Sequence, residues 1–262
     1  MNGPGSTRRL SLDDFRHEAL GLVGSTNAEC LERARRGEPG NLWITATAQS
    51  GGRGRRGRAW VSEPGNLYAS LLLIDAAPTG ELASLPLAVA LAVHDAVRAV
   101  LPPGGAPVEI KWPNDILIGR RKTCGILIEG EQLADGRHAV VIGIGVNIAF
   151  KPELANYPVT ALSEHGVSAS PEEVFARLFA AMAEALALWD RGRGIGAVVA
   201  RWREAACGIG EKITVNLTDR SISGYFSGID DKGLLLLTQD DGGRMTIAAG
   251  DVFFDGTGQK SE

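Results

Sequence analysis

Four short apolar segments between residues 108 and 147 constrain the fold of this chain more than any other feature. They span Val108 to Lys111, Ile116 to Ile118, Cys124 to Glu129 and Ala139 to Asn147. Turn-forming residues separate them at 113–115, 119–121 and 135–137. Links this short join antiparallel neighbours, because a parallel pair needs a crossover of about a dozen residues or more. The sequence therefore predicts a sheet that is at least in part an antiparallel meander.

Other segments add strands and helices around this meander. Strands are predicted at residues 20–23, 42–48 and 66–74, and helices at 26–36, 82–101, 171–190 and 196–206. Thr26 with Glu29 fits a capping box at the start of the first helix, and Gly37 fits the position just after its end. Ser170 with Glu173 fits a second capping box. The expected fold class is α+β, a mixed sheet with flanking helices.

The character of the chain changes at residues 208–210, where Gly-Ile-Gly is followed by short strands alone. These are predicted at 212–217, 221–229, 233–238 and 244–248, with turns rich in Asp and Gly between them. About 54 residues of this kind suggest a small β-barrel, which is marginally stable alone and leans on a larger domain. We therefore expect a disordered leader over residues 1–10, a main domain over 11–208 and a C-terminal β domain over 209–262.

Composition excludes several classes of protein. Hydrophobic residues make up 44% of the chain, enough for a full core, and no apolar run reaches the roughly 18 residues of a membrane span. The apolar stretch 82–101 is broken by residues such as Asp95 and Arg98, so we interpret it as a core helix, and neither a signal peptide nor membrane association is expected. Three cysteines far apart in sequence favour reduced thiols in the cytoplasm. No cysteine or histidine pair has zinc-ligand spacing, and no structural metal is predicted.

Residues 52–60, which we name the Arg/Gly loop, read Gly-Arg-Gly-Arg-Arg-Gly-Arg-Ala-Trp and hold four arginines. Glycine lets the backbone approach a ligand closely, and arginine forks grip carboxylate and phosphate groups through paired hydrogen bonds. The chain carries a net charge of −4, so the loop is a local cationic site on a mildly acidic protein. We expect it to bind an anion and to be disordered without one.

The loop fits three other descriptions less well. Residues 52–57 match the glycine pattern of dinucleotide-binding folds, but that pattern must open a helix, and here Pro64, Gly65 and a predicted strand follow. A nucleic-acid interface normally needs a broad basic face, whereas this chain has a sequence pI of about 5.7. A solvated loop without function is tolerable, because exposed arginines about 8 Å apart repel by only ~0.5 kcal/mol per pair in water.

The segment Lys111-Trp112-Pro113-Asn114-Asp115 is a second candidate for a site. It follows an apolar strand, and Pro113 restricts Trp112 to an extended conformation, which fixes where Lys111 and Asn114 point. A strand-end turn with a solvated lysine explains this segment equally well.

Several other residues have both a functional and a structural interpretation. Gly143 and Gly145 lie inside a predicted strand, where glycine often marks the close approach of a ligand or a backbone, or else a bulge. Lys122, at the start of its strand, is functional or merely exposed, and Ser25 with Thr26 alone would be a helix cap. No Ser-His-Asp or Cys-His arrangement stands out, so the chemistry indicated is cationic stabilisation of an anion without a protein nucleophile.

The order of these motifs resembles that of the biotin protein ligase family. The resemblance rests on Ser25-Thr26-Asn27, Gln49 with the Arg/Gly loop, Gly65-Asn66-Leu67-Tyr68, Lys111 to Asp115, Lys122 with Gly125-Ile126-Leu127 and Glu129, and Gly143-x-Gly145-x-Asn147. It covers about residues 20–255, and the loop followed by Lys-Trp-Pro-Asn-Asp is its most specific part. It implies a catalytic domain related to lipoate ligases and class II aminoacyl-tRNA synthetases, followed by a C-terminal SH3-like barrel.

The resemblance also implies a two-step reaction. Biotin and ATP, with Mg²⁺ carried by the nucleotide, give biotinyl-5′-adenylate and pyrophosphate. The biotinyl group then passes to a lysine of a biotin carboxyl carrier protein domain. Preorganised positive groups assist the first step, by analogy with oxyanion-hole donors worth about 10²–10³ in rate each, and a closed loop keeps water from the mixed anhydride.

Site residues follow from the same resemblance. Lys111 is the expected catalytic lysine, and Arg55 is the expected direct anion contact that acts with it. The expected biotin-binding residues are Ser25, Thr26, Asn27, Gln49, Gly52, Arg53, Arg55, Lys111, Gly125 and Gly143. The expected adenylate-binding residues are Arg53, Arg55, Arg56, Trp60, Lys111, Asn114 and Asn147. Among them Trp60 is expected to cover the adenine and Asn147 to contact it, and no metal is expected beyond the Mg²⁺ carried with ATP.

Partners and rival functions complete the prediction. Only about 20 residues precede the first motif, so we expect a monofunctional ligase without the operator-DNA-binding domain that some family members carry. Family members form dimers through the central sheet, and the sequence leaves the oligomeric state open. The rivals are a lipoate-type ligase of the same fold, a nucleic-acid-binding module that uses the loop arginines, and a non-catalytic small-molecule binder.

Overall fold

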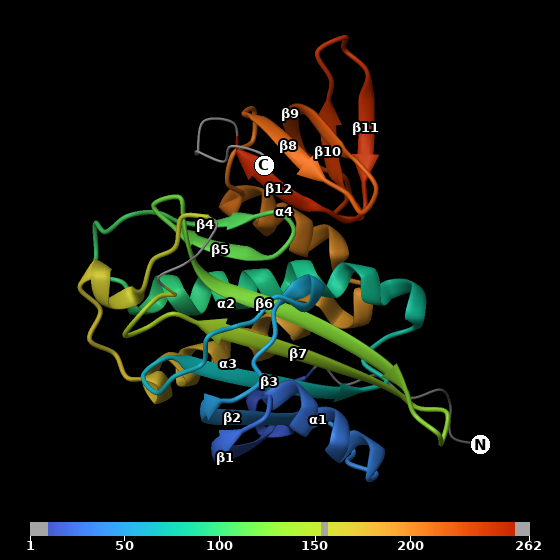
Figure 1. The fold of residues 1–262 in the computed structure, drawn as a ribbon. Coiled ribbons are helices and arrows are strands. Elements are labelled where there is room, and N and C mark those ends of the chain that lie inside the picture. The colour runs from blue at the N-terminus through green and yellow to red at the C-terminus, as the bar shows by residue number, and fades with distance from the viewer. Residues whose placement is uncertain (1–9, 153–156, 255–262) are drawn as a thin grey trace.

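A seven-stranded mixed sheet forms the centre of the main domain (Figure 1). The computed structural model describes residues 10–152 and 157–254. The strands are β1 (Arg16–Val23), β2 (Leu42–Gln49), β3 (Leu67–Ile74), β4 (Val108–Lys111), β5 (Asp115–Ile118), β6 (Arg121–Gln132) and β7 (His138–Val146). Their order is β1-β2-β3-β7-β6-β5-β4; β1 pairs with β2 in parallel, and the other neighbours are antiparallel. Because β4 to β7 follow one another across the sheet, the predicted meander is confirmed.

Helices cover both faces of this sheet. They are α1 (Thr26–Arg35), α2 (Leu85–Val100), α3 (Pro171–Trp189) and α4 (Ile195–Ala205). Successive residues of a strand point to opposite faces. Leu42 and Ile44 of β2 accordingly share a core cluster with Cys30 and Ala34 of α1, whereas Trp43 joins the larger cluster that α2 and α3 complete. The helix α1 therefore lies on one face, and α2 and α3 lie on the other (Figure 1).

The helix α2 is the buried core helix that its sequence predicts. It follows a 3-10 turn, and the combined segment Thr79–Val100 is long and apolar enough to be a membrane-span candidate by composition. However, 67% of its most apolar window is buried inside the protein, and α2 contacts α3, α4 and the sheet. A place in the protein core therefore accounts for its apolar sequence.

The C-terminal domain is a five-stranded antiparallel sheet of SH3-like form. Its strands are β8 (Lys212–Asn216), β9 (Ser221–Ile229), β10 (Leu235–Thr238), β11 (Arg244–Ile247) and β12 (Asp251–Phe254), in the order β11-β10-β9-β8-β12. Its apolar residues, among them Phe226 and Val252, are continuous with the core of the main domain. The indole Nε1 of Trp112 donates a hydrogen bond to the Gly233 carbonyl at 3.1 Å. The domain thus sits on the main domain beside β4 and α4 (Figure 1).

The structure corrects several predicted elements. The first strand begins at Arg16 rather than residue 20. Its first residues are polar and exposed or half-buried, so the sequence pattern did not reveal where the strand starts. The predicted Thr26 capping box is wrong: Ser25 is the N-cap residue and makes no side-chain cap bond, while Oε1 of Gln49 accepts the Thr26 N–H at 2.8 Å. The helix predicted from residue 82 begins at Leu85 after the 3-10 turn. The strand β12 has no counterpart among the predicted strands.

Other local predictions are confirmed. Ser170 and Glu173 form the expected capping box, and Gly37, at φ 95°, occupies the left-handed position after α1. The expected leader, residues 1–10, lies outside the described residues except for Leu10. The division at residue 208 stays our proposal; it falls between the end of α4 and the start of β8.

Candidate active site

A cavity lies between the Arg/Gly loop, strands β6 and β7, and β12 of the C-terminal domain. The predicted site residues that line it are Ser25, Thr26, Asn27, Gln49, Arg53, Arg55, Trp60, Lys111, Gly125 and Gly143. Residues that our site prediction does not include also line it, among them Arg58, Asp115, Lys122, Gly145, Asp251 and Phe253. The structure therefore brings most of the predicted residues together, although they come from six separate segments of the chain.

Buried hydrogen bonds hold the polar side chains at one end of the cavity. Oγ of Ser70 lies 2.7 Å from Oγ1 of Thr26 and 2.6 Å from Oδ1 of Asn27. Because an amide oxygen only accepts, the Ser70 hydroxyl donates to Asn27. Gln49 is fixed as well, because its Oε1 accepts from Thr26 and its Nε2 donates to Oγ of Ser62 at 2.9 Å. This end, which we name the polar floor, offers orientated donors and acceptors without net charge.

Glu129 connects the polar floor to the Arg/Gly loop. Its carboxylate accepts a hydrogen bond from Nδ2 of Asn27 at 2.7 Å. The same carboxylate pairs with Arg53 at 3.2 Å. Since the carboxylate accepts only from the NH₂ group of the amide, Glu129 also sets which way the Asn27 amide points.

Three glycines make room for larger side chains that line the cavity. A Cβ on Gly143 would lie 2.3 Å from Oδ1 of Asn27, so only glycine admits Asn27 in its present position. Gly125 and Gly145 face each other across β6 and β7, and added Cβ atoms would meet the Trp60 ring at 2.8 Å and 2.5 Å. The glycines predicted as ligand contacts therefore first accommodate the protein's own Asn27 and Trp60.

Lys111 and Lys122 bring positive charge to the cavity wall. Asp115 lies between them, 2.6 Å from Nζ of Lys122 and 3.5 Å from Nζ of Lys111. Burial raises the pKa of Asp115, but the two lysines outweigh it and lower that pKa below its ordinary value. Burial lowers the pKa of Lys122, and its pairing with Asp115 and Tyr157 outweighs burial and raises it. Lys122, left open by the sequence, is therefore a charged group in the cavity.

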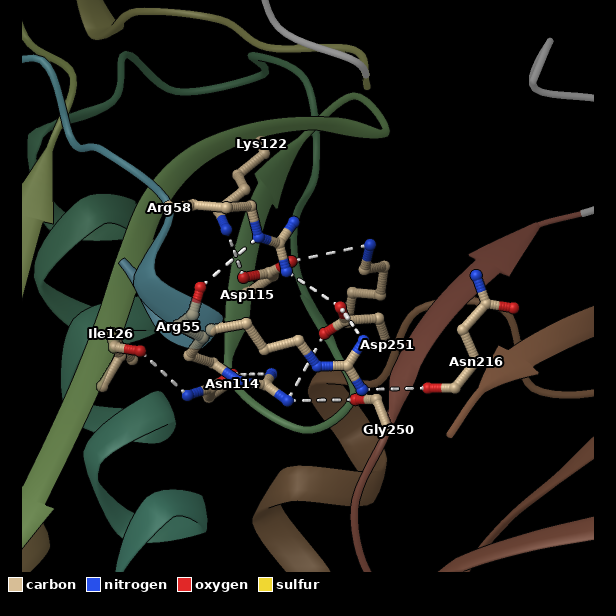
Figure 2. Close-up of polar contacts among 11 residues, drawn as sticks. Arg55, Arg58, Asn114, Asp115, Lys122, Ile126, Asn216, Gly250 and Asp251 are labelled. Atoms are coloured by element: carbon tan, nitrogen blue, oxygen red, sulfur yellow. Dashed lines mark hydrogen bonds and ion pairs between the residues drawn. The ribbon is translucent and has the colours of Figure 1, made fainter. Parts of the chain in front are cut away.

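Arg55 and Arg58 of the loop point toward the C-terminal domain (Figure 2). Arg55 donates to Oδ1 of Asn114 at 3.1 Å and to the Gly250 carbonyl at 3.1 Å. Asn114 is oriented in turn, because its Nδ2 donates to the Ile126 carbonyl at 3.1 Å. Asp251 lies within ion-pair distance of Arg55 and of two further loop arginines.

Four predicted site residues do not line the cavity, and each has another role. Gly52 gives space to Trp60 and Ser62, since a Cβ there would meet the Trp60 carbonyl and the Ser62 hydroxyl at 2.5 Å each. Arg56 donates to the Asn216 carbonyl at 3.2 Å, and Asn114 holds Arg55 as described above. Asn147 is buried, and its Nδ2 donates to the Thr160 carbonyl at 3.2 Å. The structure therefore does not bring Asn147 to the cavity wall, where a direct adenine contact requires it.

Metal-binding side chains do not gather within residues 10–152 and 157–254: no group of three or more His, Cys, Asp or Glu could hold an ion there. The two cavity carboxylates, Asp115 and Asp251, are both engaged by lysine or arginine. The cations of the cavity lining thus suit an anionic ligand.

A small acid fits this geometry, with a polar body on the floor and its carboxylate among the cations, as in ligases that form acyl-adenylates. Residues 23–147 match the biotin/lipoate A/B protein ligase family, and residues 208–255 match the biotin protein ligase C-terminal domain. The chain is 38% identical over 243 residues to the biotin–[acetyl-CoA-carboxylase] ligase of Paracoccus denitrificans, covering 90% of this chain and 100% of that protein. The chain belongs to the biotin protein ligase family.

Solved structures agree with this assignment. The fold matches biotin protein ligase from Aquifex aeolicus in complex with biotin and ATP, with a TM-score of 0.75, 27% identity, and coverage of 90% of this chain and 97% of that one. It also matches biotin protein ligase from Leishmania major in complex with biotinyl-5-AMP, with a TM-score of 0.63, 26% identity, and coverage of 89% and 98%.

Proposed function

We propose that this cavity is where the ligase activates biotin with ATP and presents it to a carrier domain. The protein is an ATP-dependent biotin ligase, and its protein substrate is a carboxylase carrier protein. The observation that supports the location is the polarity of the cavity. Its lining holds neutral donors and acceptors around Asn27 and Gln49, together with the cations Lys111, Arg55 and Lys122.

The polar floor suits the ureido ring of biotin. A ureido group has two N–H donors and one carbonyl acceptor, and a site with buried, orientated partners rejects ligands that leave those partners unpaired. The dithiolane ring of lipoate offers neither donors nor a carbonyl. The floor around Thr26, Asn27 and Gln49 therefore favours biotin over the lipoate-type rival.

In the first step, a carboxylate oxygen of biotin attacks the α-phosphorus of ATP. The bond from that phosphorus to the bridging oxygen breaks, and pyrophosphate leaves with the electron pair and Mg²⁺. Two anions must approach, so Lys111 and Arg55 offset their repulsion and stabilise the charge that develops on the phosphate. We assign Lys111 as the catalytic residue and Arg55 as its partner, with Arg53 and Trp60 beside the adenylate.

In the second step, the neutral amine of the acceptor lysine attacks the carbonyl carbon of biotinyl-adenylate. The carbon–oxygen bond to AMP breaks, AMP leaves with the electron pair, the attacking nitrogen passes a proton to the departing phosphate or to water, and an amide forms. No side chain of the ligase itself has to act as a nucleophile. The closed Arg/Gly loop protects the mixed anhydride from water until the acceptor arrives.

The nucleic-acid rival fits the arginines poorly. Arg55, Arg56 and Arg58 each pair with Asp251, and Arg53 pairs with Glu129, so each of the four guanidinium groups already has a carboxylate partner in the protein. They line the cavity or brace the loop, rather than forming a free basic face. Absence of operator-DNA binding and a cytoplasmic location stay predictions.

Incubation with labelled biotin, MgATP and an apo carrier domain tests the function. We expect label on one carrier lysine, with no transfer when ATP is omitted or when the acceptor lysine is replaced by arginine. Lipoate in place of biotin is the matched control for the floor and should give little transfer. Efficient lipoylation with no biotinylation would reverse the assignment between the two ligases, and no transfer of either acid would remove it.

A further inference from the structure

One carboxylate of the C-terminal domain holds three arginines of the Arg/Gly loop. Asp251, the first residue of β12, lies 2.8 Å from Arg58, 3.1 Å from Arg56 and 3.4 Å from Arg55 (Figure 2). Its side chain is only 16% exposed, whereas the side chains of Arg55, Arg56 and Arg58 are 29%, 44% and 51% exposed, so solvent shields these pairs in part but less than pairs between two fully exposed groups. Asp251 is also part of the cavity wall.

Backbone carbonyls beside Asp251 extend this contact. The Gly250 carbonyl accepts from Arg55 at 3.1 Å, and the Asn216 carbonyl accepts from Arg56 at 3.2 Å. Asp251 and Asn216 are register partners of β12 and β8. The edge of the C-terminal sheet therefore offers a fixed row of acceptors, and Arg55 joins this row to Asn114 of the main domain.

The loop needs such an anchor for three reasons. Its glycines make the closed conformation entropically costly, and Arg56 is held at φ 55° in the left-handed region, which non-glycine residues seldom adopt. Its guanidinium groups also repel one another when they gather. A single carboxylate offsets part of that repulsion but leaves three arginines with one negative charge, so the group keeps the capacity to bind a phosphate.

We propose that Asp251 is a positioning residue for adenylation. Through this carboxylate the C-terminal domain holds the Arg/Gly loop closed, with Arg55 and Arg58 facing the cavity. The role in adenylation rests on the function proposed above, whereas the anchoring of the loop does not. Loss of the carboxylate should therefore loosen the loop first and, as a consequence, let the adenylate escape.

The loop carries its own probe for this anchoring, because trypsin cleaves after arginine. We compare wild type with Asp251→Asn, which keeps the side-chain shape, and with Asp219→Asn, an exposed carboxylate of the same domain. Fragment masses identify cleavage between residues 53 and 58. Asp251→Asn should be cut roughly three- to thirtyfold faster there, because three partly shielded ion pairs are lost, and Asp219→Asn should match wild type. Equal cleavage of Asp251→Asn and wild type overturns the anchoring.

Retention of the intermediate tests the role in the reaction. The rate at which preformed biotinyl-adenylate leaves or hydrolyses should rise in Asp251→Asn and return toward wild type in Asp251→Glu. The KM for ATP should rise while biotin affinity changes little. Arg58→Gln should show a smaller effect in the Asp251→Asn background than in wild type, because the two residues act together. If Asp251→Asn loses biotinyl-adenylate at the same rate as wild type, or more slowly, the positioning role is overturned.

The anchoring of the loop and the role of Asp251 in adenylation are tested by different experiments. If wild type forms no adenylate, the proposed function fails, and the trypsin comparison still decides whether Asp251 anchors the loop. If Asp251→Asn loses adenylate faster but its loop is cut no faster than that of wild type, the anchoring is overturned although the function stands. A thermal unfolding scan of each variant excludes general destabilisation of the C-terminal domain as the cause.

Discussion

Replacing Gly143 by alanine tests how the polar floor is built. The new Cβ would lie 2.3 Å from Oδ1 of Asn27, whereas ordinary contacts begin at 3.4 Å. Asn27 must therefore move by about 1 Å, which takes its bonds to Ser70 and Glu129, now 2.6 Å and 2.7 Å, out of good hydrogen-bond geometry. The neutral bond is worth about 1 kcal/mol and the charged one about 1.5–3 kcal/mol.

Part of that free energy is recovered when the Asn27 side chain relaxes, so we expect the hydrogen bonds of the polar floor to contribute about 2–3 kcal/mol less to stability. The displaced Asn27 no longer offers its amide to the ligand, which costs about 1–3 kcal/mol of binding free energy, so at about 1.4 kcal/mol per tenfold biotin affinity in Gly143→Ala should fall by roughly 5- to 100-fold. Isothermal calorimetry measures this, with Gly21→Ala as the control, because a Cβ on Gly21 meets nothing within 4 Å. Adding Asn27→Ala to Gly143→Ala should restore thermal stability without restoring biotin binding. If Gly143→Ala binds biotin as tightly as Gly21→Ala does, the steric argument is refuted.

Further predictions concern the cations of the cavity, its aromatic wall and the thiols. Lys122→Met should lower the free energy of unfolding by about 3 kcal/mol, because it breaks a buried pair, whereas Lys212→Met, at an exposed pair, should cost no more than about 1 kcal/mol; chemical denaturation compares them. Because the folded pKa of Asp115 is lowered, the stabilisation by this pair is present above its unfolded pKa and is lost as pH falls through the folded value. The difference between wild type and Lys122→Met should therefore shrink in acid, below about pH 3.9, and a constant difference would contradict the pairing. Gly145→Ala should displace Trp60 and raise the KM for ATP more than the KM for biotin. Steady-state kinetics measure both constants, and an unchanged KM for ATP would exclude this role of Trp60. The three thiols are buried, which raises their pKa values, so a disulfide reagent at pH 8 should label them only after denaturation.

Elements with local signals were predictable from the sequence, and contacts between distant segments were not. The meander from β4 to β7 was predictable because its apolar runs and turns lie next to each other. The strand β12 lacks such a local signal, because it pairs with β8 (Lys212–Asn216) and not with the strand before it in the chain. Its partner in the site, the Arg/Gly loop, lies 193 residues away, the separation between Arg58 and Asp251.

The same limit applied to the site. Thr26 reads locally as a capping residue, but Gln49 from a neighbouring strand takes the acceptor role. Gly143 reads as a bulge or a ligand contact, and its actual neighbour, Asn27, comes from the start of α1. Motif order identified most of the residues that line the cavity, because that order is fixed along the chain. It could not show which residue supports which, because that depends on the packing of the sheet against the loop and the C-terminal domain.

Exchange of labelled pyrophosphate into ATP is the most direct test of adenylation in this cavity. Wild type should catalyse exchange only when biotin is present, since pyrophosphate must attack a biotinyl-adenylate to remake ATP. Lys111→Ala should retain the fold and reduce exchange by about 10²–10³-fold, the value of one preorganised charge in a transition state. Exchange without biotin, or near-normal exchange in Lys111→Ala, would contradict the account.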